Sequence, residues 1–99
     1  MNVEKIYDNK KLILKVYTQI DTVEAKDFQN EINVEMGKFD SLIIDFEKLE
    51  FISSAGLRVL MFTQNELSAR EIPFTIINIS DEIEDIFIIS GLDNFLNIA

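Results

Sequence analysis

Two neighbouring serines, Ser53 and Ser54, precede Gly56 at a point where a strand-like stretch gives way to a helical pattern. A serine at a helix entrance can accept a hydrogen bond from a free backbone amide of the first turn and so cap the helix. The same place suits an added phosphate, because free amides and the positive end of the helix dipole favour an anion. One serine can cap while the other is modified, so the residues alone leave both roles open.

Histidine and cysteine are absent from the chain. Their absence excludes a histidine phosphocarrier, Ser-His-Asp and Cys-His nucleophilic sites, an ordinary zinc site and a disulfide framework. The chemistry that remains is that of carboxylates, lysines, modified hydroxyl groups or plain binding, and no catalytic constellation can be assembled from it. We therefore expect a binding protein and not an enzyme, with no metal and no cofactor.

Composition and charge narrow the range of partners. The 99 residues, 47% of them hydrophobic, fit a single domain over residues 1–99. A formal net charge of -9 repels phosphate backbones and anionic headgroups, so no nucleic-acid partner is expected. The apolar runs are far shorter than the ~20 residues of a membrane span, and the amino terminus lacks a signal pattern. We expect a cytoplasmic protein without membrane insertion.

The pattern of apolar residues predicts the elements that must position the serines. Asp21 with Glu24 marks one helix start, and Ser80 with Asp81 marks another. The expected order is a β-hairpin (3–7 and 12–17), a helix (22–36), a strand (42–46), a polar connector (47–50), a helix (55–69), a strand (74–79), a helix from 81 to 91 and an apolar tail (95–98). This alternation predicts an α/β fold with a mixed sheet, in which the N-terminal hairpin joins parallel strands and helices pack on them.

Each helix is expected to bury one stripe of side chains. The inward residues would be Val23, Phe28, Ile32 and Met36 in the helix over 22–36, and Leu57, Leu60, Met61, Gln64 and Leu67 in the helix over 55–69. The opposite face of the second of these helices carries Ala55, Arg58, Val59, Phe62, Asn65 and Glu66. We therefore expect Val59 and Phe62 to be partly exposed, unless another helix covers them. A mixed strip beside Ser54 suits a partner interface.

Arg58 follows Ser54 by one helical turn. At this spacing the guanidinium can pair with a phosphate on Ser54, although a solvated arginine is the commoner case.

Carboxylates form two further features. Asp45 ends a buried strand, which is the place of the phosphorylated aspartate in receiver domains, but the supporting acidic pair near the first strand is absent. A hydrogen-bonded structural role is the better interpretation of Asp45. The cluster Asp81, Glu82, Glu84 and Asp85 lacks the spacing of a calcium loop, and carboxylates of a first helical turn that face solvent explain it better.

Several of these stretches, in their order, resemble the signature of the STAS domain family, which includes the bacterial anti-sigma factor antagonists. The resemblance rests on residues 42–46, 51–60, 16–28 and 88–98, the last with Gly91-Leu92-Asp93. In that family the serine two positions before the glycine accepts phosphate from a partner kinase, and this position is Ser54. Ser53 stands where phosphorylatable members usually have aspartate and is the second choice of acceptor. The glycine usual before the first-helix turn is also missing, with Thr18 or Gln19 in its neighbourhood.

The resemblance implies a function as well as a fold. The unmodified protein would bind an anti-sigma factor that is also a serine-protein kinase of the histidine-kinase-like ATPase type, and would so control sigma-factor-dependent transcription. Serine phosphorylation would end the binding, and a phosphoserine phosphatase would restore it. The alternative is a STAS docking subunit of a transporter-associated or sensory complex that is not phosphorylated. The residues implied in partner binding are Asp21, Ser53, Ser54, Ala55, Gly56, Arg58, Val59 and Phe62.

Overall fold

The computed structural model describes all residues from 1 to 99. In chain order the elements are β1 (Val3–Asp8), β2 (Lys11–Val16), β3 (Thr18–Ile20), α1 (Thr22–Asn33), β4 (Ser41–Asp45), β5 (Leu49–Ile52), α2 (Ser54–Ala69), β6 (Phe74–Ile77), α3 (Asp81–Ser90) and a short 3-10 helix (Leu92–Asn94). The predicted α/β class is confirmed, and the three helices begin within one residue of their predicted starts.

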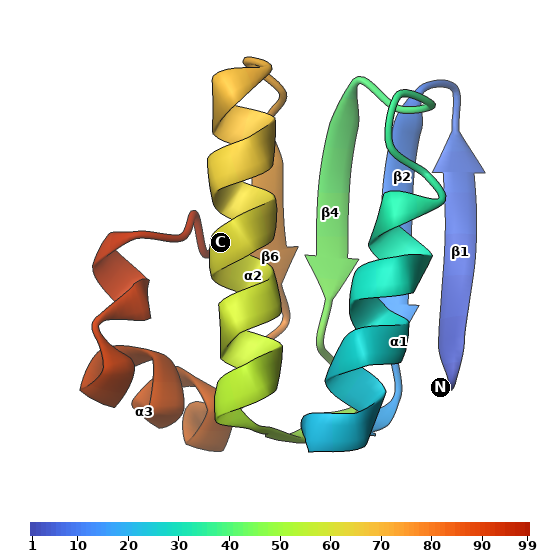
Figure 1. The fold of residues 1–99 in the computed structure, drawn as a ribbon. Helices are drawn as coiled ribbons and strands as arrows, with labels where there is room; N and C mark the ends of the chain where they lie inside the picture. Colours follow the sequence, from blue (N-terminus) through green and yellow to red (C-terminus); the bar gives the residue numbers. More distant parts are fainter.

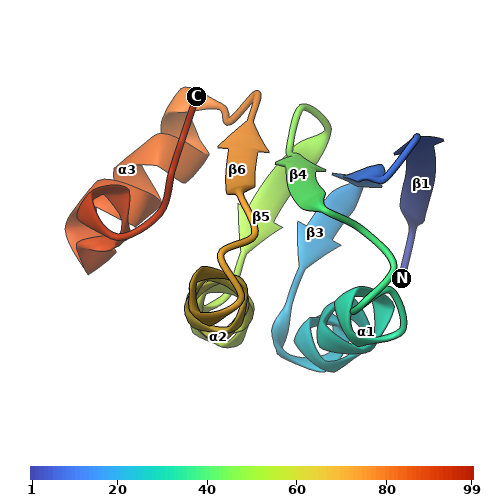
Figure 2. The same ribbon diagram turned by 90° about the horizontal axis from the view of Figure 1, so that it is seen from above.

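The main sheet has four strands in the order β1-β2-β4-β6. The β1–β2 pair is the predicted antiparallel hairpin, and its turn contains Asn9 with a φ of 56. Strands β2, β4 and β6 pair in parallel, so the sheet is mixed, as expected. Helices α1 and α2 lie side by side on one face of this sheet, while α3 lies beyond the edge strand β6 (Figures 1 and 2). None of the helices combines the length and the apolar character that a bilayer span requires.

A second sheet, which the sequence did not predict, consists of β3 and β5 in parallel. The sequence pattern indicated a polar connector over residues 47–50, but β5 begins there, at Leu49, whose side chain is buried. Thr18 begins β3 with a φ of 71, in the left-handed region that favours glycine. A β-branched residue is strained there, and Thr18 lies in the neighbourhood of the glycine that the resemblance implies and this sequence lacks.

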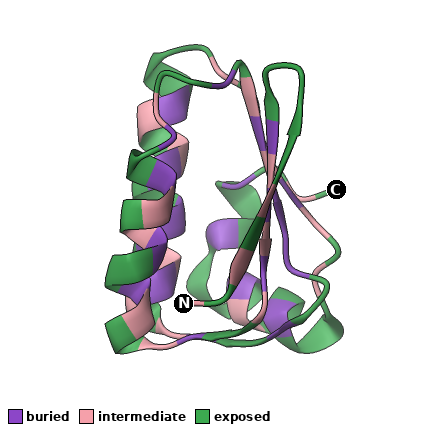
Figure 3. Cartoon of the chain, turned by 90° about the vertical axis from the view of Figure 1, so that its right-hand side faces the viewer, coloured by how far each residue is buried: buried purple, intermediate pink, exposed green.

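The core lies between the main sheet and the helices, and Figure 3 shows buried residues on the side of the helical layer that faces the strands. Two assignments of inward faces were wrong. Val23 of α1 is 78% exposed and Met61 of α2 is 41% exposed, whereas Val59 is buried at 8%. Helix α2 contacts both α1 and the strands, so its buried face is centred nearer Val59 than a single apolar stripe suggests.

Helix α1 ends at Asn33, three residues before the predicted end. The chain continues through turns in which the Glu35 and Met36 amides donate to carbonyls three residues earlier. Gly37 then takes a φ of 84, which a glycine tolerates best.

Candidate functional site

The small β3–β5 sheet brings two helix entrances to one edge of the molecule. Ile20 and Ile52 are register partners at the carboxyl ends of these parallel strands, so the residues that follow them, Asp21 and Ser53, lie side by side. The Ser53 amide donates to the Ile20 carbonyl at 2.8 Å and ties the two entrances together. The N-termini of α1 and α2 therefore lie at the same end of the molecule (Figure 1).

Both entrances are capped by the side chain that precedes the helix. Asp21 Oδ1 accepts from the Glu24 amide at 2.7 Å, as the sequence predicted. Ser53 Oγ accepts from the Gly56 amide at 3.2 Å. Of the two serines, Ser53 is thus the structural cap.

Ser54 is the first residue of α2 and its side chain is exposed. Its hydroxyl makes no hydrogen bond within the protein, unlike that of Ser53. The first backbone bond of the helix runs from the Leu57 amide to the Ser53 carbonyl at 2.9 Å, which leaves the amides of Ser54 and Ala55 without a protein partner. The exposed hydroxyl and two free amides form a place where an anion would be favoured.

Gly56 lies on the buried side of this first turn. A Cβ atom at this position would lie 2.7 Å from Ile52 Cγ1 and 2.9 Å from Ile20 Cγ2. Only glycine lets the helix approach the β3–β5 sheet so closely. Gly56 was expected to be part of the partner-binding surface, and the structure places it on the buried side of the first turn, next to the exposed Ser54.

A groove of about 400 Å³ lies between α1 and α2 and begins beside Ser54. Its lining residues lie at positions i, i+3, i+4 and i+7 of each helix: Thr22, Ala25, Lys26 and Gln29 on α1, and Ala55, Arg58, Val59 and Phe62 on α2. Val59 was expected to be partly exposed, but it is buried at the floor of the groove, where α1 packs beside it. Phe62 is 56% exposed, as the sequence predicted.

The α1 wall of this groove was missed in the sequence. Thr22, Lys26 and Gln29 are ordinary polar residues of a solvated helix, and nothing singles out any one of them. The available signal was that both sets have the same spacing, i, i+3, i+4 and i+7, and that each contains one cation, Lys26 on α1 and Arg58 on α2. Recognising it requires knowing that the helices lie side by side in parallel.

Asp45 has the predicted hydrogen-bonded structural role. Its side chain is buried, and its Oδ1 accepts from the Glu47 amide at 2.9 Å and from Asn78 Nδ2 at 3.2 Å. These bonds join the end of β4 to the end of β6, and no cation pairs with this carboxylate. Asp45 therefore braces the loop that leads into β5 and the serines.

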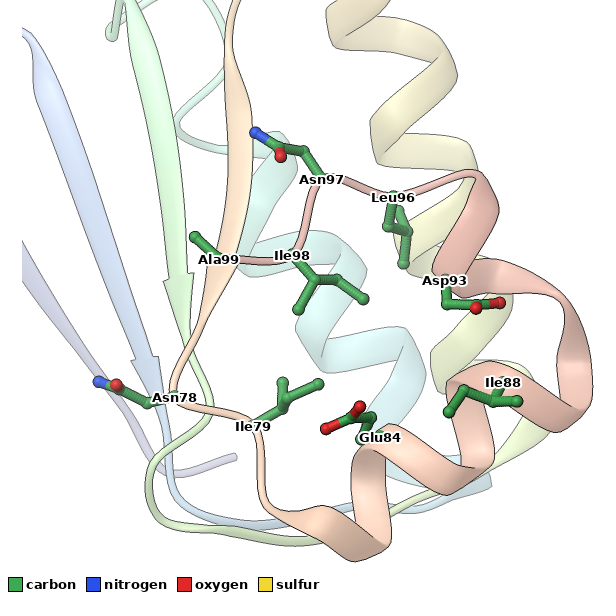
Figure 4. A pocket seen from close by; sticks show the side chains of 9 residues that line it. All are labelled: Asn78, Ile79, Glu84, Ile88, Asp93, Leu96, Asn97, Ile98 and Ala99. Atoms are coloured by element: carbon green, nitrogen blue, oxygen red, sulfur yellow. The ribbon is translucent and has the colours of Figure 1, made fainter.

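A second hollow, of about 570 Å³, lies on the far side of α2 between α3 and the C-terminal segment. Figure 4 shows Ile79, Glu84 and Ile98 around it. It shares no residue with the serine edge and includes none of the residues that the sequence indicated for partner binding.

Comparison with known proteins agrees with this architecture. The family model of the STAS domain matches residues 1–99. An anti-sigma factor antagonist from Mycobacterium paratuberculosis is similar, with a TM-score of 0.88 and 23% identity over 98% of this chain and 83% of that one. The Bacillus cell fate determinant SpoIIAA in its phosphorylated form is similar, with a TM-score of 0.77 and 20% identity over 99% and 91% of the two chains.

A domain of a much larger protein is also similar. The murine Slc26a9 anion transporter in its inward-facing state gives a TM-score of 0.68 and 15% identity, over 77% of this chain and 13% of that one. The curated proteins contain no match. At these identities the structural likenesses establish the fold.

Proposed function

The chain belongs to the STAS domain family, and from this premise we propose that it is an anti-sigma factor antagonist controlled by phosphorylation of Ser54. In the cytoplasm the unmodified protein binds an anti-sigma factor that is also a serine-protein kinase of the histidine-kinase-like ATPase type, and the bound sigma factor is released. The kinase then transfers a phosphoryl group from ATP, a phosphoserine phosphatase later removes it, and the cycle regulates transcription.

The observation that carries this proposal is the division of roles between the two serines. Ser53 Oγ is engaged as the helix cap, whereas the Ser54 hydroxyl is exposed and free. In the transfer, Ser54 Oγ forms a bond to the γ-phosphorus of ATP, the bond from that phosphorus to the β-γ bridging oxygen breaks, ADP leaves, and the hydroxyl proton is released. The free amides of Ser54 and Ala55 favour the phosphoserine product.

The phosphate acts on binding through charge and hydration. It adds about 1.5 to 2 negative charges and a bulky hydrated group beside the groove between α1 and α2. A partner that contacts the edge around Ser54 must then desolvate this group, so the complex is weakened without any refolding of the domain. A free-energy change of about 1.4 kcal/mol already alters the affinity tenfold.

The test uses the kinase-type anti-sigma factor of the same host, purified and incubated with this protein and ATP, with mass spectrometry as the readout. We expect one phosphate on the wild type and on Ser53→Ala, and none on Ser54→Ala. Ser80→Ala is the matched control, because Ser80 Oγ caps α3 as Ser53 Oγ caps α2, at the same distance of 3.2 Å. A phosphate on Ser53 with Ser54 unmodified would contradict the assignment.

The second candidate function is a STAS docking subunit that is never phosphorylated. The similarity to part of an anion transporter supports it, as does Ser53 in place of the usual aspartate. If no phosphate is found on either serine and the chain captures membrane transport subunits, this second function replaces the first.

A further inference from the structure

We propose that the groove between α1 and α2 docks an acidic amphipathic helix of a protein partner. The inference specifies the chemistry of the docking segment, and it rests on the proposed role of the protein as a partner-binding module. It concerns residues on both helices, including the α1 wall, and is separate from the identity of the phosphorylated serine.

The shape of the groove fits a helix. Each wall contributes side chains at relative positions one, four, five and eight, which is two helical turns on each of two parallel ridges. A third helix can lie along such a groove and present its own residues at the same spacing.

The apolar part of the surface lacks a cover. Val59 and Ala25 are buried at the floor, but Phe62 stands 56% exposed at the side, with Ala55 half-buried near the serine end. The apolar face of an incoming helix would remove this surface from water, and a phenylalanine ring of this kind is a common anchor at the centre of an interface.

The positive charge of the groove indicates that the docking segment is negatively charged. None of the 18 acidic residues of the chain lines it, although the chain carries a net charge of -9. Lys26 stands on one wall and Arg58 on the other; both are exposed, and neither takes part in an ion pair. Two unpaired cations around an apolar floor complement a segment that carries carboxylates beside apolar residues.

The net charge of the whole chain, unlike the two cations of the groove, disfavours occupants that are strongly acidic over their entire surface. A second copy of this chain brings a further net charge of -9, and long-range repulsion opposes its approach. A nucleic acid meets the same repulsion over the rest of the surface.

The groove also connects to the serine. Arg58 follows Ser54 by four residues, so both project from neighbouring turns on the same side of α2. A phosphate on Ser54 would compete with the partner's carboxylates for this guanidinium, because phosphate oxygens are strong acceptors for arginine. Phosphorylation of Ser54 would thus weaken docking by engaging Arg58, although the phosphate itself lies beside the groove.

The test uses two synthetic helical peptides with identical apolar residues, one with glutamate and one with lysine at every polar position. Each is titrated into the 15N-labelled protein, and the amide resonances are followed by NMR. We expect the acidic peptide alone to shift the amides of Lys26, Gln29, Arg58 and Phe62. The double reversal K26E/R58E should weaken its binding about tenfold or more.

The matched control is K11E/K48E, which makes the same change in net charge at two other exposed, unpaired lysines outside the groove. It should alter the affinity by less than about twofold, since distant exposed charges are largely screened. Amide spectra of the free variants verify that all of them are folded.

Four results would overturn the inference: equal shifts from the lysine peptide, no groove shifts from the acidic peptide, unchanged affinity of K26E/R58E, or groove shifts that depend on protein concentration without peptide, which would indicate a second copy. The experiment contains neither kinase nor ATP. A protein that is phosphorylated on Ser54 but whose groove ignores the acidic peptide therefore loses this inference and keeps its proposed function.

Discussion

The two ends of helix α1 differ in whether the charged side chains around them are paired. Just beyond its C-terminal end, the carboxylate of Glu35 is buried, and it accepts from Tyr7 Oη at 2.9 Å and from Lys5 Nζ at 3.1 Å. Lys5 also pairs with Glu31 at 2.9 Å, so this cluster holds strand β1 against the helix. At the N-terminal end, Lys26 and Arg58 have no ionic partner, and Ser54 has no hydrogen bond.

The hydrogen bonds of this paired cluster shift the pKa of its charged groups. Burial alone would raise the pKa of Glu35, but hydrogen bonds from Tyr7 and Lys5 outweigh burial and hold the pKa below the ordinary 4.5. Burial would likewise lower the pKa of Lys5, yet its bonds to Glu31 and Glu35 raise it above 10.5. Charges at this end stabilise the fold, whereas charges at the serine end are left available to a partner.

The largest expected effect tests whether the serine end is held by packing instead of charge. Gly56→Val should lower the free energy of unfolding by about 3 kcal/mol, because the new side chain meets Ile52 and Ile20 at less than a normal contact distance. Gly56→Ala should cost less, since a single methyl group displaces less. Urea unfolding checks both, and a Gly56→Val protein as stable as the wild type would contradict the close approach.

The next effect is at the charged end. Glu35→Gln keeps the shape of the side chain but removes the charge on which Lys5 and Tyr7 converge, and should destabilise the protein by about 2 kcal/mol. The control is Glu31→Gln, whose carboxylate is 37% exposed and should cost less than about 1 kcal/mol. Equal losses in chemical denaturation would mean that burial of Glu35 adds nothing.

The same residue predicts a pH dependence. Because the pKa of Glu35 is lower in the folded than in the unfolded protein, its contribution is fully present above about pH 4.5 and disappears as the pH falls through the folded value. The difference in stability between wild type and Glu35→Gln should therefore shrink below pH 4.5. Urea titrations from pH 7 to pH 3 measure this difference. A difference that grows on acidification would contradict the lowered pKa of Glu35.

A smaller effect separates the two serines. Ser53→Ala removes the cap on the Gly56 amide and should cost about 1 kcal/mol. Ser54→Ala removes a hydroxyl without a partner and should change the stability by less than about 0.5 kcal/mol. Thermal unfolding distinguishes the two variants, and a larger loss for Ser54→Ala would exchange the roles of cap and acceptor.

Local signals in the sequence were sufficient for most of the fold. Capping at Asp21 and at Ser80 depends on a few neighbouring residues, and both caps are as the sequence indicated. These features require no knowledge of distant contacts. The serine edge was located for the same reason.

Features that depend on distant neighbours were not predicted. Strand β3 has three residues and begins at Thr18, whose positive φ is not expected of a threonine. Val59 is buried because α1 lies beside it, and Lys26 lines the groove for the same reason. The spacing of apolar residues within one segment predicts neither the β3–β5 pairing nor the packing of α1 against α2.

The most direct test of the proposed switch is the affinity of the kinase-type anti-sigma factor for two forms of this protein, unmodified and phosphorylated on Ser54, measured by isothermal titration calorimetry. We predict that the phosphorylated form binds at least about tenfold more weakly, while Ser54→Ala treated with the same kinase and ATP keeps the affinity of the unmodified form. Equal or tighter binding of the phosphorylated protein would contradict the account.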